Sequence, residues 1–219
     1  MRITDRIYWY PEQGMLDCNT YLVVDDEITL LVDPGNSVYM GRLLKELRRD
    51  GFEPKDIDLI TITHLHIDHC GANQNLRDVS GAKIAIHEVQ VKNRNIFDEV
   101  SRFFGLNSPD FTEDLLLRDT LYTGSKEIKM IPTPGHSPES VCFYDPVDKV
   151  LISGDVIFDR SVGRTDLPHG NGMELKKSII NLSTLDIEYL LPGHMGIVRG
   201  REAVRKNFEF VRDFYFRFI

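Results

Sequence analysis

Three histidines and one aspartate stand within six residues in the segment THLHIDH, at positions 63–69. Imidazole nitrogens and a carboxylate oxygen are the ligands that zinc and non-haem iron prefer in proteins. In an extended segment, residues 64, 66 and 68 would project to one side, and a turn at Asp68 would bring His69 beside them. The chain has seven histidines in all, so a cluster this dense predicts a metal site rather than a solvated polar loop.

Three further candidate ligands each come directly after an apolar segment. His136 lies in the turn TPGHS that follows KMIPT, Asp155 ends KVLISGD, and His194 ends IEYLLPGH. Residues at the same ends of neighbouring strands converge on one edge of a sheet, where scaffolded loops usually hold function. We therefore expect these three side chains to meet the histidine cluster.

Seven ligands are too many for one tetrahedral ion, so the sequence predicts two divalent metal ions. Zinc is the first expectation, with iron or a mixed pair as alternatives. Three protein ligands per ion and a shared carboxylate leave room for a water, which is typical of catalytic metal sites. We expect the ligands to divide into His64, His66 and His136 for one ion, Asp68, His69 and His194 for the other, and Asp155 as the bridge.

The apolar segments that must position these residues are short, rich in β-branched side chains and bounded by Gly, Pro, Asp or Asn. That pattern is typical of buried strands. The pair Asp25 and Asp26 is a plausible hairpin turn between the first two of them. The predicted strands lie at 20–24, 28–33, 58–63, 83–87, 129–133, 140–144, 149–155 and 187–194.

Helical patterns separate the strands. Apolar residues at helical spacing predict a helix from residue 40 to about 50 and a C-terminal helix at 200–218, and residues 71–78 form a shorter helical pattern. Residues 88–119 show no strand pattern and are expected to form a helical excursion over one face. Strands interleaved with helices predict an α/β fold, with all of 1–219 in a single domain.

Composition narrows the class of protein. With 42% hydrophobic and 27% charged residues, the chain is typical of a folded globular protein rather than a disordered one. Its net charge of −8 disfavours binding to a phosphate backbone, so no nucleic-acid partner is expected. No apolar run approaches the roughly 18 residues of a membrane span.

Two features that the sequence lacks, an export signal and a CxxC pair, bear on the expected cellular location. The first twenty residues lack an export signal, and three cysteines without a CxxC pair argue for a reducing compartment. We expect a cytoplasmic protein with no membrane partner. A homodimer remains open.

The complete motif set resembles the metallo-β-lactamase superfamily. HLHIDH, TPGHS, GD at 154–155 and GH at 193–194 occur in the order of that family. The resemblance extends to Asp33 in LLVDPG, which in the family supports the metal site from behind. It implies a four-layer αβ/βα sandwich with a dinuclear site at one edge of the paired sheets. The motifs are specific for fold and metal site but weak for substrate.

The segment SVGRTDLP, at 161–168, narrows the resemblance to the glyoxalase II-like (hydroxyacylglutathione hydrolase-like) and persulfide dioxygenase-like branches. The first branch implies cleavage of a small-molecule thioester or ester by a hydroxide shared between two metals. Metals can lower the pKa of water from about 15.7 towards 7. Asp68, as a carboxylate able to orient the hydroxide, is the expected catalytic residue.

Three other functions stay open. An iron held by His64, His136 and Asp155 resembles a facial triad and would serve a persulfide dioxygenase-like oxidoreductase. A lactonase or phosphodiester hydrolase would use the same site and hydroxide. A metal-binding scaffold without catalysis is the last alternative. Only about 25 residues follow His194, fewer than the C-terminal helical domain of glyoxalase II, so the use of glutathione is in question.

Two residues in or just after the sequence GRTD, at 163–166, are candidates for substrate contact. Arg164 is a candidate to anchor a substrate carboxylate, but the expected role is to brace its own loop by pairing with a nearby acid. His169 is predicted either to contact the substrate or to face solvent. The excursion at 88–119 is the candidate substrate wall, with a simple surface cover as the alternative.

Overall fold

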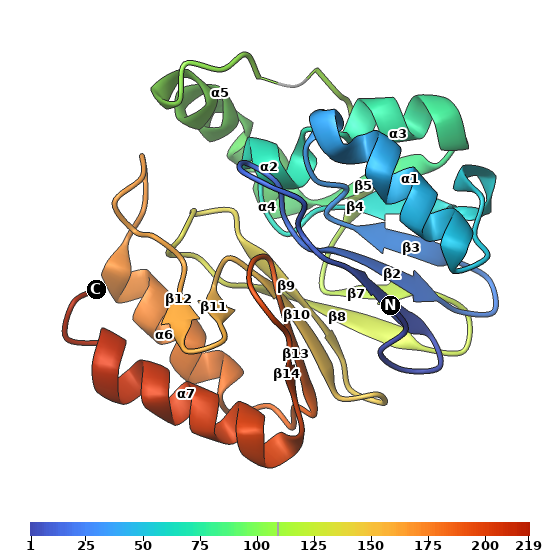
Figure 1. Ribbon diagram of the computed structural model, residues 1–219. Coiled ribbons are helices and arrows are strands. Elements are labelled where there is room, and N and C mark those ends of the chain that lie inside the picture. The colour runs from blue at the N-terminus through green and yellow to red at the C-terminus, as the bar shows by residue number, and fades with distance from the viewer. Residues whose placement is uncertain (109) are drawn as a thin grey trace.

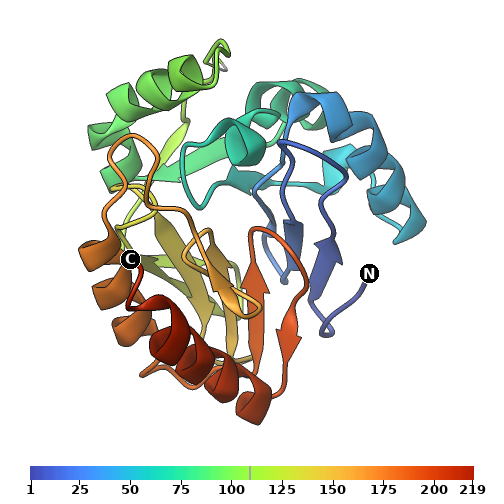
Figure 2. The same cartoon turned by 60° about the vertical axis from the view of Figure 1, so that its left-hand side comes forward.

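The structure, a computed structural model, describes residues 1–108 and 110–219. Two six-stranded sheets pack face to face, and helices cover the outer face of each sheet (Figures 1 and 2). The order of layers is therefore helix, sheet, sheet, helix, and the predicted α/β sandwich is confirmed. Among the described residues, no helix combines the length and apolar character that a membrane crossing needs.

The first sheet contains the N-terminal half of the chain. Its first three strands pair antiparallel, and the pairs from β3 to β6 are parallel. In sheet order its strands are β1 (Ile7–Tyr10), β2 (Thr20–Val24), β3 (Thr29–Val32), β4 (Leu59–Thr61), β5 (Lys83–His87) and β6 (Leu115–Leu117). The helices of this half are η1 (Ser37–Tyr39), α1 (Met40–Arg49), η2 (Pro54–Asp56), α2 (Ile67–Cys70), α3 (Asn73–Ser80), α4 (Glu88–Lys92) and α5 (Arg94–Phe103).

The second sheet is antiparallel except where β10 and β13 pair in parallel. In sheet order its strands are β14 (Val198–Arg199), β13 (Tyr189–Pro192), β10 (Val150–Gly154), β9 (Val141–Asp145), β8 (Glu127–Pro132) and β7 (Thr120–Tyr122). A separate two-stranded ribbon pairs β11 (Ile157–Phe158) with β12 (Ser161–Val162). Helices α6 (Gly172–Leu182) and α7 (Arg201–Tyr215) cover the outer face (Figure 1).

The central strands are buried on both faces, which explains their nearly continuous apolar sequence. Val32 of β3 and Leu191 of β13 both belong to the core between the two sheets. Their chain neighbours, Leu31 and Leu190, face outward instead and pack under the helices. Alternate residues of one strand thus serve two different cores.

The structure differs from the predicted elements mainly in the edge strands of the sheets and at the end of the C-terminal helix. Residues 88–119 are not wholly helical, because β6 pairs in parallel with β5 at the edge of the sheet. Leu115 and Leu116 of this strand are exposed, so the segment lacks the alternation that marks a half-buried strand. The C-terminal helix is shorter than predicted and ends at Tyr215. Short strands at 7–10 and 120–122 were not predicted from the sequence.

The two sheets are tied together at the edge where β4, β8, β10 and β13 end. Val141 N donates to Thr63 O at 2.8 Å, and Asn19 N donates to Gly193 O at 2.7 Å. Each of these bonds joins one sheet to the other. The loops that leave the four strands therefore share one rim of the sandwich.

Candidate metal centre

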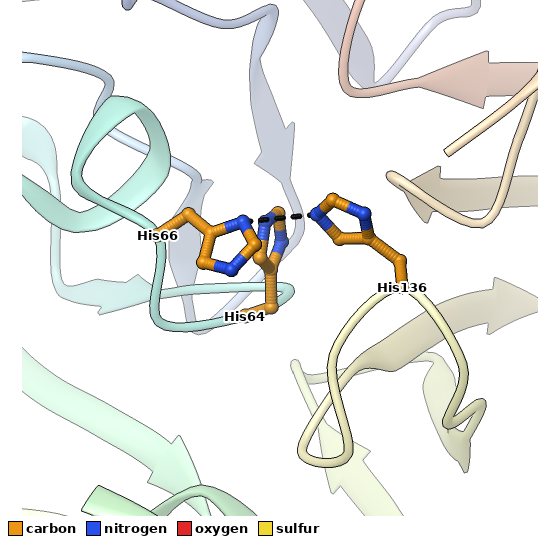
Figure 3. Close-up of side chains that lie close together, drawn as sticks. All are labelled: His64, His66 and His136. Carbon is orange, nitrogen blue, oxygen red and sulfur yellow. Dashed lines mark hydrogen bonds between the residues drawn. The ribbon is translucent and has the colours of Figure 1, made fainter. Parts of the chain in front are cut away.

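The first group of predicted ligands meets between the loop after β4 and the turn after β8. His64, His66 and His136 are buried, and one ligand atom from each lies within 4.8 Å of the other two. Figure 3 shows the three imidazoles converging, with His66 Nδ1 and His136 Nε2 2.9 Å apart. Burial lowers the pKa of His64 well below its usual value and that of His66 to about 3. Both rings are therefore neutral at pH 7, which is the form that binds metals.

The second group lies beside the first. Asp68, His69 and His194 also place one ligand atom each within 4.8 Å of the others. His194 Nε2 lies 3.4 Å from Asp68 Oδ2, and His69 Nε2 lies 4.0 Å from the same oxygen. The second predicted metal position thus has its three side chains in one place.

Asp155 lies between the two groups. Its Oδ1 is 3.3 Å from His69 Nε2, and its Oδ2 is 3.4 Å from His194 Nε2 and 3.5 Å from His136 Nε2. One carboxylate therefore faces nitrogens of both groups. The structure brings all seven predicted ligands together, with Asp155 at the place of a bridge.

One local prediction is wrong in its geometry. The chain does not continue as an extended segment through residues 64–68, because it bends at 63–65 and α2 begins at Ile67. The amide of His69 donates to His66 O at 3.0 Å, which closes the first turn of this helix. Asp68 and His69 thus reach the site from a helical turn.

The residues present fit a pair of divalent cations. Within the described residues, His64 Nε2, His69 Nε2 and Asp155 Oδ1 are buried without a hydrogen-bond partner. Such atoms are rare in folded proteins, and each costs about 1–3 kcal/mol when unpaired. Three of them aimed into one cluster indicate a ligand between them.

The electrostatics of the cluster also favour added positive charge. Burial alone would lower the pKa of His194, but the carboxylates of Asp155, Asp68 and Glu12 raise it to about 12. Although burial opposes it, His194 and His69 hold the pKa of Asp155 well below its usual range. The carboxylates therefore remain ionised and attract a proton or a metal ion to this position.

Four of the five imidazoles use Nδ1 to hydrogen-bond a group outside the cluster. This arrangement fixes the ring and leaves Nε2 free to bind a metal, as outer partners of metal-binding histidines usually do. The four pairs are His136 Nδ1 with Arg164 O at 2.7 Å, His69 Nδ1 with Asp33 Oδ2 at 2.9 Å, His194 Nδ1 with Glu12 Oε2 at 2.8 Å, and His64 Nδ1 with Thr63 Oγ1 at 3.1 Å.

Asp33 supports the site from behind, in the position that the family resemblance implies. Its fully buried carboxylate accepts hydrogen bonds from Thr63 N at 2.7 Å, Thr63 Oγ1 at 2.8 Å and His69 Nδ1. The residue adopts a left-handed backbone conformation with φ of 57°. Strain of this kind is typical of functional sites.

Asp33→Asn is expected to destabilise the fold and weaken metal binding. Asparagine keeps the shape and tolerates the left-handed backbone, but its NH2 group must face one of the three donors. One buried donor is left unpaired, so the free energy of unfolding should fall by about 2 kcal/mol. Chemical denaturation measures this change. The exposed turn variant Asp26→Asn is the control, and equal stability of the two variants would contradict the account.

Gly193 allows Asp155 and His69 to approach the backbone. A Cβ on Gly193 would lie 2.3 Å from Asp155 Oδ1 and 2.7 Å from His69 Cε1. We expect Gly193→Ala to displace these side chains and to weaken metal binding at least 10-fold, as changes in supporting residues do. Gly196→Ala is a matched control, because a Cβ there meets nothing within 4 Å. Metal content after dialysis against a weak chelator compares them, and equal retention would refute the role of Gly193.

The two candidate substrate residues pair with other side chains. Arg164 forms two 2.9 Å hydrogen bonds with Asp166, and both side chains are mostly exposed. His169 Nε2 lies 2.7 Å from Glu99 Oε2 and thereby joins its loop to α5. The pairing of Arg164 matches the expected role, in which it braces its loop. Contact of either residue with a substrate stays a prediction.

Sequence reasoning missed two carboxylates at the site. Glu12 pairs with His194 across 182 residues, and no local pattern marks it. Glu139 Oε1 accepts from the amide of Leu65, between two candidate ligands, at 3.1 Å. The sequence did contain an indication that Glu139 lies near the site, because it follows the candidate ligand His136 by three residues.

Sequence comparison places this architecture among known proteins. Residues 14–194 match the family described as the metallo-beta-lactamase superfamily. A probable metallo-hydrolase of Methanocaldococcus jannaschii, MJ0888, is 37% identical over 185 residues, which cover 80% of this chain and 86% of the relative. The probable metallo-hydrolase YqgX of Bacillus subtilis is 30% identical over 177 residues, or 76% and 78% of the two chains.

Solved structures show the same likeness. BLEG-1, described as a B3 metallo-beta-lactamase, superposes with a TM-score of 0.76 at 29% identity and covers 94% of this chain and 96% of its own. TTHA1623, solved in a di-iron-bound form, gives a TM-score of 0.72 at 31% identity, with coverage of 87% and 94%. The similarity to both extends over most of each chain.

Proposed function

Since the chain belongs to the metallo-β-lactamase superfamily, we propose that it is a metal-dependent hydrolase of the glyoxalase II-like branch that cleaves a small-molecule thioester. The observation that carries the proposal is the position of Asp155 between two three-residue groups of metal-binding type. A closed structural zinc site needs four protein ligands and no shared carboxylate. Two closed sites would need eight ligands, and the seven side chains here, with Asp155 shared, would leave room for a water or a substrate atom between the two positions.

The proposed division of ligands follows the geometry. One ion would be held by His64, His66 and His136, the other by Asp68, His69 and His194, and both by Asp155. Two divalent cations in these positions would supply Lewis acidity, which lowers the pKa of water from about 15.7 towards 7. Zinc is our first choice for the metal, and the di-iron form of TTHA1623 makes iron the alternative.

Asp68 is the proposed catalytic residue. Burial alone would raise its pKa, but His69 and His194 hold that pKa below its usual range, so the carboxylate is ionised at neutral pH. Its side chain is 19% exposed, which leaves it in reach of solvent entering the site. An ionised carboxylate there can accept a hydrogen bond from the attacking water and hold its proton at an Oδ atom.

Aromatic side chains lie beside the charged cluster and on α5. The ring of Phe158 packs edge-on against His194, with ring centroids 5.8 Å apart. On α5, Phe103 and the adjoining Phe104 are both exposed. We propose that α5 and the loop at 163–169, joined by the contact between Glu99 and His169, form the substrate wall.

A second candidate function is a persulfide dioxygenase-like reaction at a single iron. TTHA1623 binds iron, there as a pair, and the approach of His136 Nε2 to Asp155 Oδ2 favours this candidate because both residues belong to its ligand set. In that case His64, His136 and Asp155 would hold the metal, and His66 would be a neighbour.

Assays on protein of known metal content separate these functions. The zinc-loaded protein should release thiol from a hydroxyacylglutathione or an acyl-coenzyme A thioester, and should consume no O₂ with glutathione persulfide. A lactone and a phosphodiester complete the panel. If either is cleaved faster than the thioesters, the substrate belongs to that class instead. Uptake of O₂ with persulfide by the iron form, without thiol release by any form, would overturn the proposal.

A further inference from the structure

The four histidines with outer partners differ in the charge of those partners. His64 and His136 hydrogen-bond to neutral oxygens, a threonine hydroxyl and a backbone carbonyl. His69 and His194 hydrogen-bond to carboxylates. A carboxylate partner makes an imidazole a stronger ligand than a neutral partner does. The asymmetry therefore concentrates negative charge behind the second metal position.

Glu12 supplies this charge for His194 from the N-terminal segment. Its Oε2 lies 2.8 Å from His194 Nδ1, and its Oε1 accepts from the amide of Met195 at 3.1 Å. The two carboxylate oxygens of Glu12 thus accept hydrogen bonds from two consecutive residues.

The backbone that carries His194 is held in place by the same N-terminal segment. The amide of Asn19 donates to Gly193 O at 2.7 Å, and its side chain donates to Pro192 O and Met195 O at 2.9 Å each. Met195 has a left-handed backbone, with φ of 67°. Asn19 therefore fixes the loop, and Glu12 is left to fix the imidazole.

We propose that Glu12 is a positioning residue that holds His194 with Nδ1–H toward its carboxylate and Nε2 toward the metal, and so strengthens metal binding at the second position selectively. This inference rests on the two-metal site of the proposed function. It adds that the affinity of the position formed by Asp68, His69 and His194 depends on a residue outside the motifs. The position formed by His64, His66 and His136 does not touch Glu12.

Glu12→Gln tests the proposal with little change of shape. His194 Nδ1 and Met195 N face different oxygens of Glu12, so in a glutamine of the same shape one of the two donors would face an NH2 group instead of an acceptor. Stepwise titration of the metal-free protein with Co²⁺, followed by calorimetry and visible absorption, should show two binding events in the wild type. In the variant, the event at the second position should weaken by 10- to 100-fold, and the other should keep its affinity. Glu27→Gln, in the exposed turn between β2 and β3, is the control and should match the wild type.

Other results would overturn the inference. Equal weakening of both events would mean that Glu12 only stabilises the fold, and two unchanged events would mean that it does not act on His194. A wild type that binds no metal would contradict the proposed function as well as this inference, whereas the other two results leave that function intact.

A second measurement does not depend on the folding of the variant. Imidazole ¹H–¹⁵N spectra of the zinc-loaded wild type should show a proton on His194 Nδ1 that exchanges slowly with solvent. If the proton is on Nε2 instead, Glu12 does not set the tautomer and the proposal fails.

Discussion

Asp155→Ala is expected to lose both metal ions and to reduce hydrolysis by about 100-fold or more. Asp155 is the one predicted ligand whose two oxygens approach both groups, His69 through Oδ1 and His136 and His194 through Oδ2. Its removal leaves two dications facing each other with less negative charge between them. The loss should therefore exceed the 10- to 100-fold that changes in supporting residues produce.

Metal analysis after gel filtration measures this effect together with thioester turnover. Asp159→Ala is a suitable control, because Asp159 is an exposed carboxylate in the nearby turn between β11 and β12. It should retain both metals and full activity. Two tightly bound metals in Asp155→Ala would refute the bridge.

His66→Ala should empty or weaken the first metal position and lower hydrolysis by at least 10- to 100-fold. In the two-metal account His66 is a direct ligand, and its Nδ1 lies 2.9 Å from His136 Nε2 (Figure 3). In the single-iron account the ligands are His64, His136 and Asp155. Iron would then stay bound in the variant, and O₂ consumption would survive with a smaller loss.

Asp68→Asn tests the other half of the site in parallel. It should weaken the second position and remove the carboxylate that orients the attacking water, so that metal binding and turnover both fall. Metal stoichiometry and thioester turnover in the two variants separate the accounts. One iron and most O₂-dependent activity in both, without thioester cleavage by the wild type, would show the hydrolase assignment to be wrong.

The central strands and the seven clustered side chains could be predicted because both depend on local pattern. The strand β4 is a short apolar run buried on both faces, and His64 comes three residues after its end. Parallel and neighbouring strands that end at one rim bring Asp155 and His194 to the same place. Only the path of the chain through Asp68 differed, because a helical turn replaced the expected extension.

Physical reasons explain why the edge strands and the side-chain partners that are distant in sequence could not be predicted. The strand β6 is exposed on much of its surface, so burial imposes no pattern on its sequence. Glu12 acts through a contact across 182 residues, and a single glutamate in a loop carries no spacing signal. Pairing with a nearby acid was the favoured role of Arg164, but the sequence did not identify the acid, which the structure shows to be Asp166.

The number of metal ions that restore hydrolysis tests the central claim most directly. Metal-free protein is titrated with Zn²⁺ while bound metal and thioester cleavage are followed in the same samples. We predict that two equivalents bind per chain and that full turnover appears only when both are bound. Saturation at one equivalent, or thioester cleavage that does not depend on added metal, would contradict the two-metal account.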